Sequence, residues 1–179
     1  MNSKLRTGAL LAIVPLILAT LAACTPTVAL APAADATNPG CAEIIVRLPD
    51  AVANQAIRAT NAQATGAWGN PTSVLLRCGV TPPGATTATC YTVKGVDWLI
   101  DDSKKPRYVF TTFGRDPATE VIVDSNLTDG QGTIVLDELA NAIGTIKQTK
   151  QCLTREDVLG SASGVTPTAT PTPSPSPSK

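Results

Sequence analysis

Short apolar runs separated by Gly, Pro and Asp fill the middle of the chain, and their pattern is that of a folded domain. Several of these runs alternate apolar and polar residues, which is typical of β-strands joined by turns. We expect a two-residue hairpin turn at Lys94-Gly95. The predicted strands cover residues 74–79, 90–93, 96–100, 107–113 and 119–123.

Two segments favour helices instead. Aliphatic residues recur with helical spacing from Leu136 to Ile146, so this segment should present one apolar stripe. Residues 41–48 fit a short strand or a short helix, and their leading Cys-Ala-Glu favours the helix. The predicted fold is therefore α+β: an antiparallel four- to five-stranded meander with one or two helices packed on one face.

The first 24 residues have the pattern of an export signal. Lys4 and Arg6 precede an apolar stretch of 14 residues, Gly8 to Leu21, whereas a membrane-spanning helix needs about 20 apolar residues. The stretch ends in Leu-Ala-Ala-Cys, which has the form of a lipobox. We expect a lipoprotein signal peptide over residues 1–23, with Cys24 as the lipidated N-terminus of the mature chain.

Two alternatives stay open for this segment. One is an ordinary signal peptide in which Cys24 is incidental, and the other is an uncleaved anchor over residues 7–23. The lipoprotein is favoured because the basic leader, the length and the lipobox agree. Two acyl chains on Cys24 give stable anchoring, so the predicted location is the extracytoplasmic face of the cell membrane.

The predicted domain, residues 41–159, lies between two segments without apolar periodicity. Residues 24–40 are rich in Ala, Pro and Thr, and we expect a tether that holds the domain off the membrane. In residues 160–179, Pro, Ser and Thr make up 14 of 20 positions, which predicts disorder. This tail is either a tolerated end or a wall-penetrating or O-mannosylated segment.

The cysteine count agrees with export. Assigning Cys24 to the lipid leaves four of the five cysteines, an even set that predicts two disulfides. Of the three possible pairings we favour Cys78–Cys90, which would close a Pro- and Gly-containing excursion, together with Cys41–Cys152, which would tie the ends of the domain. No Cys-x-x-Cys pair supports a zinc site.

Composition and charge remove several functional classes. The chain has no histidine, which excludes Ser-His-Asp and Cys-His catalysis and histidine-ligated metals. Its 14 Lys and Arg equal its 14 Asp and Glu, which argues against binding to nucleic acid. We expect no cofactor, no metal and no nucleic-acid partner, and a monomer of one domain, since 179 residues hardly allow two.

Three polar clusters invite a chemical interpretation, but each fits a loop better. Asp101-Asp102 runs into a charged segment that is typical of a solvated hairpin loop, and Ser103 beside Lys104 lacks any catalytic motif. The segment from Asp124 begins like a calcium loop, but its sixth and twelfth positions lack the required Gly and Glu. No catalytic residue is therefore predicted.

Both tryptophans and two arginines form the least ordinary constellation. Either the tryptophans belong to the core and the arginines to the surface, or they line a shallow pocket in which an arginine holds an anion beside an aromatic edge. Antiparallel pairing of neighbouring strands would bring Asp97-Trp98 close to Arg115. The candidate ligand-binding residues are Trp98, Arg115, Trp68 and Arg77.

Several of these segments, taken in order, resemble one known family. LPDAV, AWGNP, VLLRCGV, VDWL, FGR followed by Asp-Pro, and a late Cys are similar to the actinobacterial domain of unknown function 3515. The resemblance covers about residues 40–153 and leaves the lipobox and the tail outside. It implies a small exported or membrane-anchored protein, and it brings no established activity and no catalytic residue.

Two functions stay open. The favoured one is a non-enzymatic cell-envelope lipoprotein that binds a partner protein or a small, anionic envelope ligand. The alternative is a hydrolase or transferase that acts on cell-wall or lipid precursors through carboxylates such as Asp97. A cleft with two carboxylates about 5–10 Å apart would favour the enzyme, and a cleft with aromatic residues and one arginine would favour binding.

Overall fold

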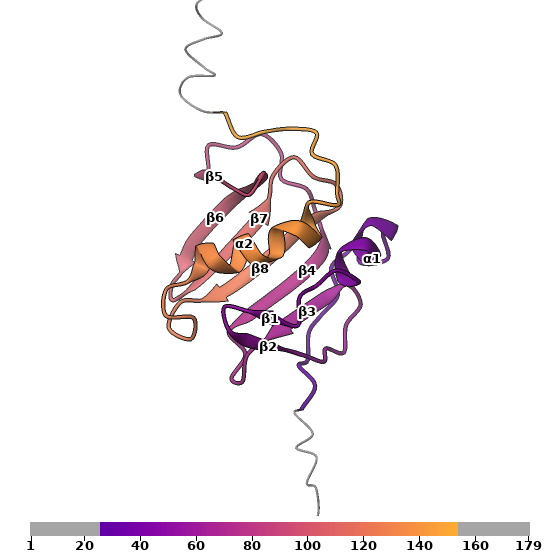
Figure 1. The fold of residues 1–179 in the computed structure, drawn as a ribbon. Coiled ribbons are helices and arrows are strands. Elements are labelled where there is room, and N and C mark those ends of the chain that lie inside the picture. The colour runs from indigo at the N-terminus through magenta and orange to yellow at the C-terminus, as the bar shows by residue number, and fades with distance from the viewer. Residues whose placement is uncertain (1–25, 154–179) are drawn as a thin grey trace, which may run out of the picture.

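Figure 1 shows the computed structural model of the chain, which describes residues 26–153. The predicted signal peptide, Cys24 and the predicted tail lie outside these residues. The helices are α1 (Pro39–Ile45) and α2 (Gly132–Ile143). The strands are β1 (Ala51–Val52), β2 (Gln55–Arg58), β3 (Thr65–Trp68), β4 (Val74–Val80), β5 (Cys90–Val93), β6 (Val96–Lys104), β7 (Arg107–Thr112) and β8 (Ala118–Asp124).

The strands form one antiparallel sheet of two meanders. The strand order is β1-β2-β3-β4-β8-β7-β6-β5, so the chain leaves β4 in the middle, crosses to the far edge at β5 and returns to pair β8 with β4 (Figure 1). The prediction of four to five strands was wrong, because the sheet has eight. The unpredicted β1, β2 and β3 have only two to four residues each, too few to show an alternating pattern.

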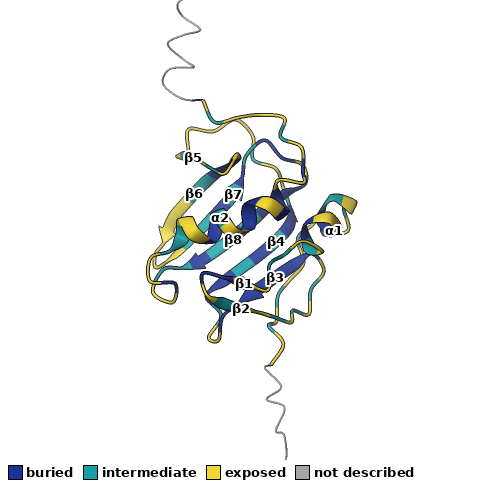
Figure 2. Ribbon diagram, viewed as in Figure 1, coloured by how far each residue is buried: buried dark blue, intermediate teal, exposed yellow. Residues whose placement is uncertain are grey.

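Both helices pack on one face of the sheet, as predicted, and the core lies beneath them. In β4 and β8, alternate residues are fully buried, with Leu76 and Val121 side by side in the register. The apolar stripe of α2, Leu136, Leu139 and Ile143, is buried in the same hydrophobic core. Figure 2 shows α2 lying across the sheet. This confirms the helix, which ends before the predicted Ile146.

Two local predictions can be compared directly with the structure. The α1 helix and the Lys94-Gly95 hairpin are confirmed, and both hairpin residues have the positive φ that such a turn requires. The Asp101-Asp102 pair is exposed, as expected of a solvated segment, but it belongs to the end of β6. The turn itself lies at Lys105-Pro106.

All four domain cysteines form disulfides, but the favoured pairing was wrong. The bonds join Cys41 to Cys78 and Cys90 to Cys152. The sheet order explains the difference, because β4 and β5 are four strand spacings apart, or about 19 Å. Cys78 and Cys90 therefore cannot meet, although only the excursion between β4 and β5 separates them in the sequence.

The first described residues do not form the predicted tether but lie against the domain. Val28 forms a parallel bridge with Thr60, and further along the backbone N–H of Asp35 donates to Gly79 C=O at 3.0 Å. Gly79 has a φ of +93°, and an added Cβ would come within 2.4 Å of the Asp35 backbone. Glycine at this position therefore allows the N-terminal stretch to dock on β4.

Candidate functional site

The predicted ligand-binding tryptophan and arginine do not form an open surface. Trp98 is 0% exposed and Arg115 is 5% exposed. Trp98 belongs to the hydrophobic core and shares the face of the sheet with its register partners, Tyr91 of β5 and Thr112 of β7. An aromatic edge with a free guanidinium, the arrangement that would hold an anion, is therefore not presented by these two residues.

Arg115 instead clamps the C-terminal segment to the sheet. Its guanidinium donates to Ile146 C=O, to Gly95 C=O at 2.9 Å and to Gln148 Oε1 at 3.1 Å. Burial lowers the pKa of Arg115, and the nearby Asp97 carboxylate opposes this shift. The guanidinium still carries its charge at neutral pH, so it needs the partners that the structure gives it.

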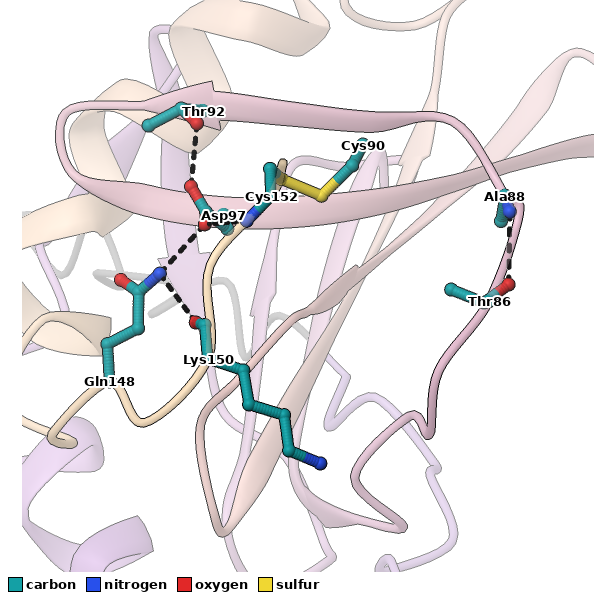
Figure 3. Close-up of a disulfide and its surroundings, with 8 residues drawn as sticks. All are labelled: Thr86, Ala88, Cys90, Thr92, Asp97, Gln148, Lys150 and Cys152. Atoms are coloured by element: carbon teal, nitrogen blue, oxygen red, sulfur yellow. Dashed lines mark hydrogen bonds between the residues drawn. A yellow bond between two sulfur atoms is a disulfide. The ribbon is translucent and has the colours of Figure 1, made fainter. Parts of the chain in front are cut away.

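Asp97 is the second centre of the same network (Figure 3). Its carboxylate accepts from the Thr92 hydroxyl at 2.6 Å, from Gln148 Nε2 at 2.8 Å and from the Cys152 backbone N–H at 2.7 Å. Gln148 thus bridges Asp97 and Arg115 through the two ends of one amide. A buried carboxylate with three donors has little capacity left for acid–base chemistry.

Arg77 and Trp68 also have structural partners. Arg77 forms a two-point contact with Glu120 Oε1, at 3.0 and 2.6 Å, across neighbouring strands β4 and β8. Trp68 is 0% exposed, and its indole N–H donates to Pro49 C=O at 3.0 Å. The structure thus buries both tryptophans and gives both arginines hydrogen-bond partners within the domain.

An apolar pocket lies instead between α2 and the outer strands of the sheet. Its volume is about 460 Å³, within the usual range of small-ligand pockets. None of the lining residues is charged, and the polar groups that line it are hydroxyls and backbone. They are Tyr91, Thr92, Val93, Ile100, Tyr108, Phe110, Val123, Ser125, Gly130, Gly132, Thr133 and Leu136.

Gly132 gives this pocket part of its room. It is the first residue of α2, and a Cβ added to it would meet only the ring of Phe110, at 3.8 Å. The side chain of a larger residue would therefore enter the pocket without a clash at the backbone. An apolar pocket of this kind accepts an uncharged apolar group, and its lining has no charged side chain to pair with an anion.

A comparison with protein-family models identifies the family of the chain. The model described as "Protein of unknown function (DUF3515)" matches residues 7–152. The chain belongs to this family. The match confirms the resemblance predicted from the sequence motifs and corrects its extent, because it begins at residue 7 and so includes the N-terminal apolar segment and the predicted lipobox. No curated protein and no solved structure matches the chain.

In this DUF3515 protein, the residues that carry the family resemblance hold the architecture together. The VDWL and FGR motifs supply Asp97 and Arg115 of the network. The LPDAV and AWGNP motifs meet in the bond between Pro49 and Trp68. These motif residues therefore stabilise the fold of this chain and do not form a chemical site.

The pocket adjoins an unpaired edge of the sheet. β5 is the last strand of the sheet order, so among residues 26–153 its only strand neighbour is β6. The N–H of Ile100 donates to Thr89 C=O at 3.2 Å, and every second residue from Thr89 then bonds to β6. The backbone groups of Cys90 and Thr92 therefore point outward, away from the sheet.

Sequence reasoning missed this site for identifiable reasons. Tyr91 is 54% exposed and comes from the predicted hairpin, but its position beside α2 depends on the crossing to the far edge. Gly130 and Gly132 are of the residue type expected in ordinary turns, so the sequence does not mark them as pocket residues.

In residues 26–153, no group of three or more Asp, Glu, His or Cys could hold a metal ion. Over the same range, no helix has the length and hydropathy of a membrane span.

Proposed function

We propose that this DUF3515 protein is a non-enzymatic cell-envelope lipoprotein that binds an extended segment of a partner polypeptide between β5 and α2. The observation that carries the binding role is the apolar pocket directly beside the edge strand β5, which has one strand neighbour, β6, among residues 26–153. A bulky apolar side chain of the partner occupies the pocket, and its backbone pairs with β5. Strand addition of this kind takes affinity from backbone hydrogen bonds and specificity from side-chain pockets.

The geometry of β5 supports an extended partner. Cys90 and Thr92 are two residues apart, which corresponds to about 6.8 Å in an antiparallel strand. An extended partner offers its own outward N–H and C=O groups with the same repeat, so both sets pair at once. Tyr91 and Val93 point toward the α2 face between these positions, where a partner's side chain would meet them.

The chemistry of the pocket supports binding over catalysis. No lining residue is a carboxylate, whereas the alternative hydrolase or transferase requires two carboxylates in one cleft. Asp97, the carboxylate proposed for that role, is buried and accepts from three donors. The uncharged lining also favours an apolar side chain over the anionic ligand first considered.

The proposed location is the extracytoplasmic face of the cell membrane, with the domain anchored through acyl chains on Cys24. Two disulfides support this location, because structural disulfides persist in oxidising compartments. The lipobox supports the anchor. Intact-mass measurement of the native protein should find a diacylglyceryl group on a chain that begins at Cys24, and an unmodified full-length chain would contradict this.

Selection from a library of displayed random peptides tests the binding proposal. The bait is the mature full-length chain, and peptides of about ten residues are long enough to pair with β5 and reach the pocket. Enriched peptides should share a bulky apolar residue flanked by residues of high β-propensity. Failure to enrich any such sequence would contradict the proposal.

Two variants locate the binding. Gly132→Leu fills the pocket, and Thr92→Pro removes an outward N–H, so each should weaken a selected peptide at least about tenfold. Gly84→Leu is the control for Gly132→Leu, because an added side chain meets open space there. Thr92→Val is the control for Thr92→Pro, since it keeps the N–H and loses only the hydroxyl. If Gly132→Leu alone weakens binding, the peptide binds through the pocket without pairing to β5, and the strand pairing is wrong.

A further inference from the structure

We infer that the anchored domain lies directly on the bilayer, with the β1–β2 edge of the sheet at the lipid headgroups and the β5 edge directed away from the membrane. This orientation rests on the proposed anchor at Cys24. It replaces the tether predicted from composition, and it makes the surface around Pro26, Ala56 and Ile57 an interaction surface for lipid.

The contacts at the start of the described chain carry the inference. Arg58 donates from Nη2 to Pro26 C=O at 2.5 Å. Val28 is paired on both sides, since its N–H donates to Ala59 C=O at 2.9 Å and its C=O accepts from the Asn61 N–H at 3.3 Å. The stretch from Pro26 is therefore fixed along the edge of the sheet, where a spacer would need to be free.

Leu30 extends this contact further along the chain. Its backbone N–H donates to the Asn61 side chain at 2.8 Å. Arg58 in turn is held by Gly69 C=O at 3.2 Å and by the Thr72 hydroxyl at 3.0 Å. The arginine thereby joins the N-terminal stretch to the turn between β3 and β4, so the stretch cannot lift away without breaking several bonds.

The distance from the anchor to this surface is short. Cys24 is two residues before Pro26, and two extended residues span at most about 7 Å. Acyl chains on Cys24 lie in the bilayer, so the surface around Pro26 stays close to the headgroups. Ile57 on β2 is 40% exposed. The preceding residue, Ala56, points to the opposite face of the same strand and is also exposed. Both are uncharged, which suits a surface that contacts lipid.

The same geometry directs the binding edge outward. β2 and β5 are six strand spacings apart in the sheet order, or about 29 Å. The described chain starts at one end of the domain and stops at Leu153 near the opposite end (Figure 1). An anchor at the first end therefore leaves β5 and its pocket accessible to partners in the envelope.

Depth-dependent fluorescence quenching tests this orientation. The full chain with its acyl chains is incorporated into phosphatidylcholine–phosphatidylglycerol vesicles, with a genetically encoded fluorescent amino acid at Ala56 or at Ala88. Ala88 is the matched control, because it is an exposed alanine next to β5. Nitroxide-headgroup lipids should remove most of the fluorescence at Ala56 and little of it at Ala88. Equal quenching at both positions would overturn the inference.

A second variant separates a fixed surface from a tether. A flexible Gly-Ser insertion of about twelve residues between Thr25 and Pro26 frees the domain, so the difference between Ala56 and Ala88 should disappear. A difference that persists would mean that something other than the short connection orients the domain, and would overturn the inference. Intact mass of each preparation shows the anchor, and its absence would overturn the proposed location as well. Peptide binding on the same vesicles reports separately on the pocket.

Discussion

The Asp97 carboxylate accepts a hydrogen bond of 2.7 Å from the backbone N–H of Cys152, which lies 55 residues further along the chain. The Cys90–Cys152 disulfide closes next to this contact (Figure 3). Asp97 thus positions the C-terminal cysteine through its backbone, and the carboxylate that suggested catalysis acts in the architecture.

Asp97→Ala should therefore destabilise the domain by about 3 kcal/mol, because three donors lose the buried, charged carboxylate that accepts their hydrogen bonds. Urea denaturation followed by tryptophan fluorescence measures the change. Asp101→Ala is the control at an exposed carboxylate of the same strand. Similar stability of the two variants would show that the network contributes little.

Arg115→Ala should also destabilise, by about 2–4 kcal/mol, because it leaves the carbonyl groups of Gly95 and Ile146 without their donor. This replaces the sequence-based hypothesis that Arg115 recognises a ligand at the surface. Peptide binding by the residual folded fraction should be unchanged. Loss of binding at unchanged thermal stability would restore the earlier hypothesis.

Gly114→Ala and Gly95→Ala form a matched pair. Their φ angles are +74° and +75°, so an alanine meets the same backbone strain at both. An added Cβ at Gly114 would overlap Lys150 C=O, whereas at Gly95 it meets open space. Gly114→Ala should lower the melting temperature much more than Gly95→Ala, and equal shifts would show that the C-terminal segment gives way without cost.

Replacing each tryptophan by phenylalanine should separate hydrogen bonding from packing. Both indoles are fully buried, but only Trp68 donates, to Pro49 C=O. The Trp98 indole N–H has no partner within residues 26–153. Trp68→Phe should therefore cost about 1 kcal/mol more than Trp98→Phe in chemical denaturation, and the reverse order would contradict this assignment.

The observed disulfide pairing changes the expected cost of losing each cysteine. Cys41→Ser and Cys78→Ser open the same loop of 37 residues, so they should destabilise equally. Chain entropy gives about 3.8 kcal/mol for this loop and about 4.3 kcal/mol for the loop of 62 residues closed by Cys90–Cys152. Denaturation of the single variants, with non-reducing peptide mapping of the wild type, checks both the pairing and the order.

Patterns with local causes could be predicted from the sequence. The hairpin at Lys94-Gly95 depends on two adjacent residues that tolerate positive φ, and the α2 stripe depends on helical spacing. The disulfides and the candidate site depend on strand order instead. No local sequence pattern shows that the chain leaves β4 and enters the sheet again at its far edge. The spatial neighbours of Cys78, Cys90 and Tyr91 therefore could not be predicted from their spacing in the sequence.

Buried polar residues are the other limit. In the sequence, Asp97-Trp98 and Arg115 have the composition of a recognition site, and only the path of the C-terminal segment reveals that Gln148 connects the carboxylate to the guanidinium. Charged residues next to turns are usually solvated, and for this reason the sequence favoured a surface role for Arg115.

The crossing from β4 to β5 divides the molecule into two halves that are each covalently closed. Cys41 and Cys78 both precede the crossing, and Cys90 and Cys152 both follow it. The β4–β8 ladder and the packing of α2 join these halves, and neither disulfide of residues 26–153 links one half to the other. The exposed crossing, residues 81–89, is the only covalent connection between the halves among the described residues. A single cut there would leave two disulfide-closed fragments held together by the β4–β8 pairing and the packing of α2, which is also the geometry in which two molecules can exchange halves.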